Sequence, residues 1–270
     1  MKISFQSIPL HSISEDSWGI SAFPKSFRAI TWNLLAPCWK RTSYGRESDS
    51  RTEWEYRLNC STEQILQTES DIICIQELWF DEEYIKLFTD VFSEKYHIFT
   101  LQRVHKKPDG LAILIKKNTF PKPQAQGFDF YDFGSRVGLM LVWDSLILLN
   151  IHLTFPHNNQ YDRKIRLSQA LDIKEILENH HMKTQIVVGD FNGSIHDEAV
   201  SRLMSEAILY PMINHSNFVT HVSHRGDEMA CDLFLSSINS FTDVLIHPID
   251  LSLSDHCIVQ AQVHVPMERE

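Results

Sequence analysis

Runs of apolar residues that stop at a polar side chain recur along the chain. The clearest is Ile186 to Val188, which precedes Gly189, Asp190 and Asn192 and is typical of a buried strand with a polar turn at its C-terminal end. Other apolar runs predict strands that end near Asn33, Glu77 and His152. A further predicted strand contains Asp232, and the final one opens with the adjacent pair Asp255 and His256. We therefore expect several strand ends to contribute side chains to one site.

Helical periodicity separates many of these strands. The spacing of apolar residues predicts helices over residues 54–66, 81–96, 161–178 and 198–204. The predicted strands cover residues 27–35, 71–77, 96–103, 110–115, 137–142, 146–153, 186–189 and 231–235, and a final strand opens within 253–259. Strand, helix and strand in succession indicate a layered α/β architecture.

Length and composition indicate one domain. With 270 residues, 43% of them hydrophobic, the chain can bury a large core, and no shift in composition marks a second module. We expect a single domain over residues 27–270, preceded by a lead-in or edge strand over residues 1–26 that carries no catalytic group. Five dispersed cysteines without a CxxC pair indicate core thiols in a reducing compartment. The sequence has no apolar run long enough for a membrane span, so we expect no membrane partner. We expect the protein to be a monomer and to be located in the cytoplasm, or alternatively in the nucleus.

The net charge limits how a polyanionic substrate would bind. The 25 basic and 35 acidic residues give −10, which does not suit a broad basic surface. A bound divalent cation would supply local positive charge. A strip of basic residues before and on the first helix would be a second source: Lys40, Arg41, Arg46, Arg51 and Arg57.

Carboxylates and amides at strand ends favour a hard divalent ion. Asp190 and Asn192 are two residues apart and would point the same way, although an Asx turn explains the same pair. Glu77 follows a buried run, where a carboxylate is costly unless it is paired or bound to a cation. Taken singly, Asn33 and His152 are more typical of hydrogen-bonded residues at a strand end than of ligands, and a surface turn is the alternative explanation for Glu77. With no cysteine expected in reach, the set predicts Mg²⁺ or Mn²⁺ and metal-assisted phosphoester hydrolysis.

An EF-hand reading of the Asp190 segment is excluded. Asp190, Asn192 and Ser194 match the start of a calcium loop, but that loop needs Gly at its sixth position and Glu at its twelfth. Ile195 and Ser201 stand there.

The order of these motifs resembles the endonuclease/exonuclease/phosphatase superfamily over residues 27–265. The matching motifs are Trp32-Asn33, Gln76-Glu77, His152-Leu153, Gly189-Asp190-Phe191-Asn192, Asp232 and Ser254-Asp255-His256. Further segments are most similar to the deadenylase and nocturnin branch and to plant members that carry EF-hands: Trp54-Glu55-Tyr56-Arg57, Asp109-Gly110-Leu111-Ala112 and Ser223-His224-Arg225-Gly226. The resemblance implies a four-layer α/β sandwich in which two packed mixed sheets are flanked by helices.

The resemblance also implies roles for individual residues. Glu77, Asn33 and Asp255 would hold or adjoin the metal, and Asp190 would activate or orient water. Asn192 and His152 would contact the phosphate or nucleophile. His256 would contact the scissile phosphate, with Asp232 orienting its ring. Two arginines are candidate substrate-binding residues: Arg57 and Arg136.

The implied substrate is single-stranded RNA, which a deadenylase-like enzyme would shorten from the 3′ end. Two departures from the deadenylase pattern bear on the substrate: the motif after Asn192 lacks a proline, and Leu233 replaces an aromatic residue. The alternatives are a DNA-end-processing nuclease, an enzyme acting on inositol phosphates or sphingomyelin, and a binding module without turnover.

Overall fold

A computed structural model describes residues 11–12, 18–19, 22–157, 159–213 and 218–265 of the chain. Much of the predicted lead-in therefore lies outside the described residues. Its described segment β1 (His11–Ser12) pairs antiparallel with β6. Among the described residues, no helix is long and apolar enough to cross a membrane.

The first sheet has seven strands. Their spatial order is β1, β6 (Tyr96–Gln102), β7 (Asp109–Lys116), β5 (Ile72–Trp79), β2 (Ser26–Asn33), β17 (Val259–His264) and β16 (Phe241–Ile246). The central pair β2 and β5 is parallel, and the other neighbours are antiparallel. The parallel pair brings two strand C-termini to one edge, which positions Asn33 near Glu77.

The second sheet has six strands. Their spatial order is β12 (Tyr210–Pro211), β15 (Asp232–Ser236), β11 (Thr184–Asp190), β10 (Leu146–His152), β9 (Val137–Val142) and β8 (Gln124–Asp129). The pair β10 and β11 is parallel. Both sheets are therefore mixed, as the sequence led us to expect.

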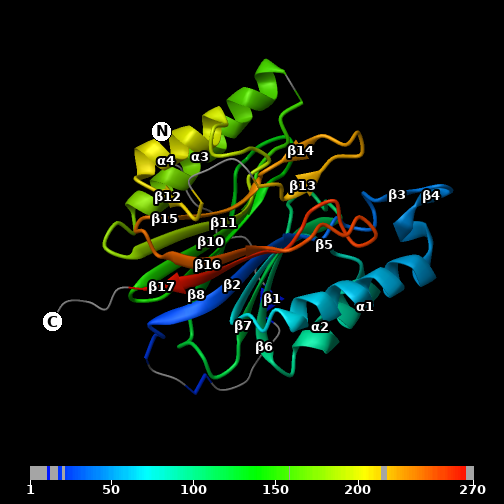
Figure 1. Ribbon diagram of the computed structural model, residues 1–270, viewed down its shortest axis with the longest axis horizontal. Coiled ribbons are helices and arrows are strands. Elements are labelled where there is room, and N and C mark those ends of the chain that lie inside the picture. The colour runs from blue at the N-terminus through cyan, green and yellow to red at the C-terminus, as the bar shows by residue number, and fades with distance from the viewer. Residues whose placement is uncertain (1–10, 13–17, 20–21, 158, 214–217, 266–270) are drawn as a thin grey trace.

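Helices cover the outer face of each sheet, as Figure 1 shows. The first sheet carries α1 (Arg51–Gln67) and α2 (Glu82–Phe92), and the second carries α3 (Gln160–Glu178) and α4 (Glu198–Ala207). Asp81, Asn159 and Asp197 cap the last three helices by accepting hydrogen bonds from first-turn amides. The resulting order of layers is helix, sheet, sheet, helix, so the predicted four-layer sandwich is confirmed.

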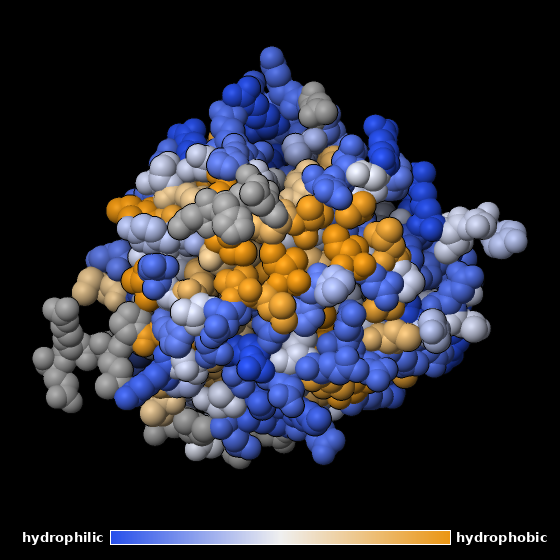
Figure 2. All heavy atoms as spheres, viewed as in Figure 1, coloured by the Kyte–Doolittle hydropathy of each residue, from blue (hydrophilic) through white to orange (hydrophobic). Residues whose placement is uncertain are grey.

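Three apolar clusters hold the layers together. The central one fills the space between the sheets with residues such as Phe27, Leu139 and Phe234, each at most 1% exposed. The outer two pack the helices onto the sheets. On the face shown in Figure 2, hydrophobic side chains also gather over β16 and the loop after it, and hydrophilic ones surround them. These layers give the site at the sheet ends a rigid base.

Two short hairpins lie outside the main sheets. They are β3 (Arg41–Thr42) with β4 (Gly45–Arg46), and β13 (His221–Val222) with β14 (Glu228–Met229). The first is followed by a short 3₁₀ helix, Glu47–Asp49. The sequence pattern did not predict either hairpin, and it also missed β8 and β16, whose exposed alternate residues dilute the apolar signal.

Candidate active site

The register of the second sheet places three predicted site residues in one row. His152, the last residue of β10, stands opposite Asp190, the last residue of β11, and Asp190 stands opposite Asp232, the first residue of β15. All three are at most 5% exposed. His152 Nε2 lies 3.4 Å from Asp190 Oδ2. His152 and Asp232, which are 80 positions apart in the sequence, therefore both lie beside Asp190 because their strands pair with β11.

Asn33 joins the two sheets at this edge. Its Nδ2 donates to Asp190 Oδ2 at 3.0 Å, and its Oδ1 accepts from the Leu35 amide at 3.0 Å. Deeper in the core, Gln76 Nε2 donates to Asn150 Oδ1 at 2.7 Å and forms a second polar link between the sheets. Such satisfied buried networks fix the relative position of the layers that carry the site.

From the sequence we expected Glu77 to end its strand. Instead it lies at an irregularity within β5. The strand continues to Trp79, and the register with β7 shifts between Gln76 and Leu78. Glu77 has φ of 54°, a costly conformation for a residue with a side chain. A bulge re-aims the side chain at that position. Glu77 therefore lines the cavity at the sheet edge, where its Oε2 accepts from the Ala36 amide at 3.1 Å.

Gly189, the residue before Asp190 in β11, is explained by strand pairing. Gly189 has φ of 137°, and a Cβ there would lie 2.0 Å from the carbonyl oxygen of Ile151. The glycine therefore permits close strand pairing and not the approach of a ligand. Asn192 has φ of 48°, which asparagine tolerates better than most residues. Its amide donates to Asp190 Oδ1 at 2.7 Å, so the Asx turn is present, and both residues still line the cavity.

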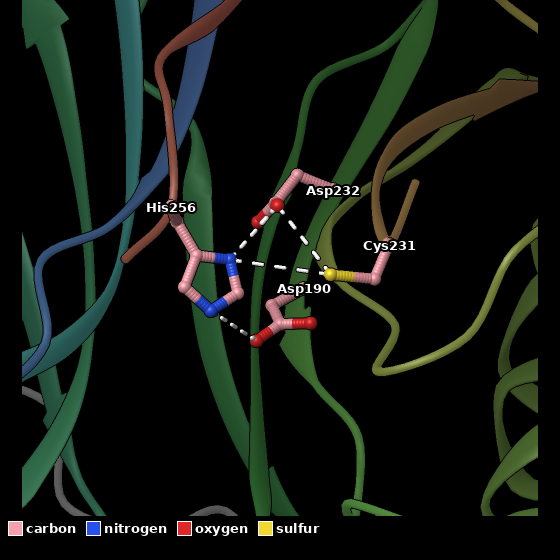
Figure 3. A group of neighbouring side chains, drawn as sticks. All are labelled: Asp190, Cys231, Asp232 and His256. Carbon is pink, nitrogen blue, oxygen red and sulfur yellow. Dashed lines mark hydrogen bonds and ion pairs between the residues drawn. The ribbon is translucent and has the colours of Figure 1, made fainter. Parts of the chain in front are cut away.

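Asp232 and His256 form the dyad that the sequence predicts. His256 Nδ1 lies 2.9 Å from Asp232 Oδ2, and its Nε2 lies 3.7 Å from Asp190 Oδ2. Figure 3 shows the ring between the two carboxylates. Burial alone would lower the pKa of His256, but Asp232 and Asp190 outweigh it and raise that pKa to about 10. His256 is therefore an imidazolium at neutral pH.

One expectation about ligands is wrong, because a cysteine does lie in reach of the acidic residues. Cys231, Asp190, Asp232 and His256 have ligand atoms within 4.8 Å of one another. Cys231 is 1% exposed, and burial together with Asp232 raises the pKa of its thiol well above the usual value. Its Sγ lies 3.6 Å from Asp232 Oδ2 (Figure 3), so the protonated thiol donates to the dyad.

Asp255 lies on the other side of His256 and is partly exposed. Its Oδ2 is 3.6 Å from His221 Nε2, and its Oδ1 is 3.9 Å from His256 Nε2. Burial acts to raise the pKa of Asp255, but His221 and His256 outweigh it, so that pKa is lowered. Asp255 Oδ1 is nevertheless buried without a hydrogen-bond partner among the described residues.

One cavity of about 860 Å³ is lined by the predicted site residues Asn33, Glu77, His152, Asp190, Asn192, Asp255 and His256, whereas Asp232 does not line it. Glu77, Asp255 and Asn33 together offer it carboxylate and amide oxygens. Burial, followed by the negative charges of Asp109 and Asp255, raises the pKa of Glu77 to about 7 against the opposing effect of Arg136. Excess negative charge, an unpartnered carboxylate oxygen and an oxygen donor set fit a hard divalent cation.

The two candidate substrate-binding arginines have different environments. Arg136 lines the cavity. Arg57 is 4% exposed, and its guanidinium donates to both oxygens of Glu47 and to three backbone carbonyls. All five donors of Arg57 are occupied, so its assignment to substrate binding is wrong. Arg57 instead fixes the loop after β2 and the segment before His256.

Most of the predicted basic strip is also engaged within the protein. Arg51 pairs with Glu55 at 2.9 Å and with Glu83 at 2.5 Å. Lys40 lies 3.4 Å from Glu47 and donates to the carbonyl of Ser252. Only part of the strip is therefore available to a substrate.

Several residues near the site carried no sequence signal of their own. His221 reaches His256 through an isolated β-bridge, and their ring centroids are 4.3 Å apart. Asp109 is 1% exposed, pairs with Arg103 and acts electrostatically on Glu77. Asp109 belongs to a segment that resembles the family, but nothing in its spacing marks it as a neighbour of Glu77.

Comparison with known proteins places this geometry in a family. The model of the endonuclease/exonuclease/phosphatase family matches residues 30–256. An uncharacterized calcium-binding protein of Arabidopsis thaliana is 30% identical over 78% of this chain and 51% of its own length. The Ccr4 exoribonuclease subunit of Saccharomyces cerevisiae is 29% identical over 39% of this chain and 14% of its own length.

Solved structures share the fold. A crystal structure of ANGEL2, a 2′,3′-cyclic phosphatase, superposes with a TM-score of 0.70 at 17% identity and covers 95% of this chain and 98% of its own. The human nocturnin catalytic domain gives 0.65 at 18% identity and covers 90% and 95%. At these identities the superpositions establish the fold alone.

The fold and the polar sheet edge are those of phosphoester-processing α/β sandwiches. The chain belongs to the endonuclease/exonuclease/phosphatase family, which confirms the resemblance seen in the sequence. It spans about half the length of the Arabidopsis relative and 14% of the yeast Ccr4 subunit.

Proposed function

We propose that this chain is a Mg²⁺-dependent phosphodiesterase that removes nucleotides from the 3′ end of single-stranded RNA. The observation that carries the proposal is the meeting of Glu77, Asp190 and His256 at one cavity, although they come from different strands and segments. An imidazolium, two carboxylates and adjacent amides supply what phosphoester hydrolysis needs: charge stabilisation, water orientation and proton transfer.

Glu77, Asn33 and Asp255 would hold the metal ion. When bound, the ion would neutralise charge on the phosphate and lower the pKa of a bound water. Glu77 suits the role because its carboxylate faces a negative environment that a cation relieves. Asn33 would contribute by orienting Asp190, to which it already donates a hydrogen bond.

Asp190 would orient or deprotonate the attacking water. Burial and the charge of Asp232 raise the pKa of Asp190, while His256 opposes that effect, so the carboxylate is a better base than an exposed aspartate. Asn192 would bind the phosphate or the nucleophile beside it. The Asx turn fixes the backbone of both residues relative to the cavity.

Two histidines would contact the phosphate in different charge states. His256 stays protonated and would donate from Nε2 to a phosphate oxygen, with Asp232 holding Nδ1. Burial and Arg136 lower the pKa of His152 well below its usual value, so its neutral ring would act as a hydrogen-bond donor without charge. Arg136, which also lines the cavity, would bind a further phosphate oxygen.

RNA is favoured as substrate by the relatives that match in sequence. The yeast match is a 3′-5′ exoribonuclease subunit, and a match in Kluyveromyces lactis with the same name is 30% identical over 82% of this chain. Cytoplasmic localisation and a monomeric state stay part of the proposal.

A substrate panel tests the function. The protein would be incubated with poly(A) RNA, single-stranded DNA, inositol phosphates, sphingomyelin and a 2′,3′-cyclic nucleotide, with Mg²⁺ and with EDTA. We expect poly(A) to be shortened from its 3′ end only with Mg²⁺. Intact poly(A) together with turnover of an inositol phosphate or a lipid headgroup would contradict the RNA assignment. Full activity in EDTA would contradict the metal requirement.

A further inference from the structure

A second cavity adjoins the one that Glu77, Asp190 and His256 line, and the proposed function assigns it no role. It also measures about 860 Å³. Five residues line both cavities: Leu35, Ser223, His224, Arg225 and Asp255. The turn at residues 223–227, between β13 and β14, therefore borders both spaces. The two cavities are therefore adjacent along this turn.

The second cavity is positively charged in a protein whose net charge is −10. Lys40, Arg41 and Arg225 line it, against the single carboxylate of Asp255. Lys40 pairs with Glu47, so the excess of positive charge comes from Arg41 and Arg225. An anionic ligand would be attracted here without a broad basic surface.

Two of these cations have unused donors. The side chains of Arg41 and Arg225 are exposed and make no hydrogen bond or ion pair with the described residues. Six other arginines form ion pairs within the described chain: Arg51, Arg57, Arg103, Arg163, Arg166 and Arg202. A free guanidinium is suited to bind a phosphate with two parallel hydrogen bonds.

The turn that carries Arg225 has a defined backbone. Ser223 Oγ accepts hydrogen bonds from the amides of Arg225 at 3.2 Å and Asp227 at 3.1 Å. The Gly226 amide donates to the carbonyl of Ser223 at 2.8 Å, and Gly226 has φ of 83°. These bonds hold the backbone of Arg225 at the boundary between the cavities.

An aromatic surface accompanies the charge. Trp39 lines the second cavity and is 38% exposed. Exposed aromatic rings beside cations are the usual platform for stacking the bases of single-stranded nucleic acid. The cavity thus offers groups for a phosphate and for a base.

We propose that Arg41 and Arg225 bind the phosphodiester next to the scissile one, so that the substrate chain runs from the catalytic cavity along residues 223–227 into the second cavity. This inference rests on the proposed phosphodiesterase function and narrows its substrate to chains with more than one phosphate. A substrate with one phosphate occupies only the catalytic cavity and gains nothing from the second.

A comparison of two substrates tests the proposal. One is a 5′-labelled RNA octamer, and the other is thymidine 5′-p-nitrophenyl phosphate, which has a single phosphodiester. Arg41→Ala should lower kcat/KM for the octamer about tenfold more than for the small ester, because only the octamer loses a charge-assisted contact to a second phosphate, and a tenfold change corresponds to about 1.4 kcal/mol. Lys122→Ala is the matched control, since Lys122 is exposed, carries the same charge and lines neither cavity. Equal losses on both substrates would overturn the proposal.

A binding measurement separates this inference from the proposed function. Fluorescence anisotropy of the octamer in EDTA, at several salt concentrations, needs no turnover. Arg41→Ala should weaken binding and reduce the slope of log K against log salt by about 1, whereas Lys122→Ala should leave the slope unchanged. If wild-type protein binds the octamer in this manner but cleaves nothing, the proposed function fails, while the binding of a phosphodiester chain by Arg41 stands. Identical slopes for wild type and Arg41→Ala refute the inference.

Discussion

The two sides of the candidate catalytic cavity differ in the charged groups that the protein itself places beside their carboxylates. On the side of Asp190 and Asp232, carboxylate oxygens accept from Asn33, the Asn192 amide and His256. On the side of Glu77 and Asp255, burial and like charges raise the pKa of Glu77 to about 7, whereas on the first side the His256 ring lies between Asp190 and Asp232. Each side retains one buried carboxylate oxygen without a hydrogen-bond partner among the described residues: Asp232 Oδ1 and Asp255 Oδ1. On the first side the folded chain supplies the positive charge through His256, and under the proposed function a metal ion would supply it on the second.

The largest expected effect comes from removing the charge of Glu77. Glu77→Gln keeps the shape and the hydrogen bond to Ala36 but removes the carboxylate that would hold the ion. Metal-ion catalysis supplies several kcal/mol, so we expect turnover to fall on the order of 10⁴-fold. Calorimetry should show weaker Mg²⁺ binding for Glu77→Gln than for Asp232→Asn. Equal Mg²⁺ affinity in the two variants would remove the difference between the two sides.

The next effect concerns Asp232 and His256, on the preorganised side. His256→Ala should lower the rate about 10²–10³-fold by removing the phosphate contact. Asp232→Asn should cost part of that loss, because it releases the ring and lowers the pKa of His256. Residues that act as a unit have strongly non-additive effects. We expect the double variant to be scarcely slower than His256→Ala.

Two measurements check the dyad. Kinetics of the four proteins in the mutant cycle give the coupling, and multiplication of the two single losses would show that the residues act independently. Titration of the His256 ring by NMR should show an upper pKa in the wild type that falls in Asp232→Asn. If Asp232 only stabilised the fold, the effects of Asp232→Asn and His256→Ala would show no coupling in this cycle.

The sequence was sufficient for the elements that carry strong apolar runs. The segments at β2, β5, β10, β11 and β15 were predicted with their polar residues, and pairing of these strands brings Asn33, His152, Asp190 and Asp232 together. Motif order supplied the family, because each motif is weak and the ordered set is specific. Spacing alone did not reveal which residues would touch.

The errors arose where tertiary contacts decide the outcome. Arg57 lies in a basic stretch of the sequence that suggested substrate binding, but its side chain is buried and pairs with Glu47. Cys231 looked like a core thiol and lies beside the dyad because β15 begins one residue later. The bulge at Glu77 depends on pairing with β7, which no local pattern predicts.

The smallest expected effect is on stability and concerns Glu77 in the metal-free protein. The folded-state pKa of Glu77 is about 7, above its ordinary value of 4.5, because burial and neighbouring carboxylates disfavour the charged form. A carboxyl whose pKa is raised on folding contributes stability below pH 4.5, and that stability is lost as the pH rises through about 7. Glu77→Gln stays neutral, so it should be more stable than wild type at pH 8 by about 1–3 kcal/mol and similar at pH 4.5.

Thermal melts in EDTA at the two pH values measure this difference. Added Mg²⁺ should raise the melting temperature of the wild type more than that of the variant, since a ligand of the folded state stabilises it. A variant that is less stable than wild type at pH 8 without metal would show that Glu77 is already compensated by the protein, and the two sides of the cavity would then be alike.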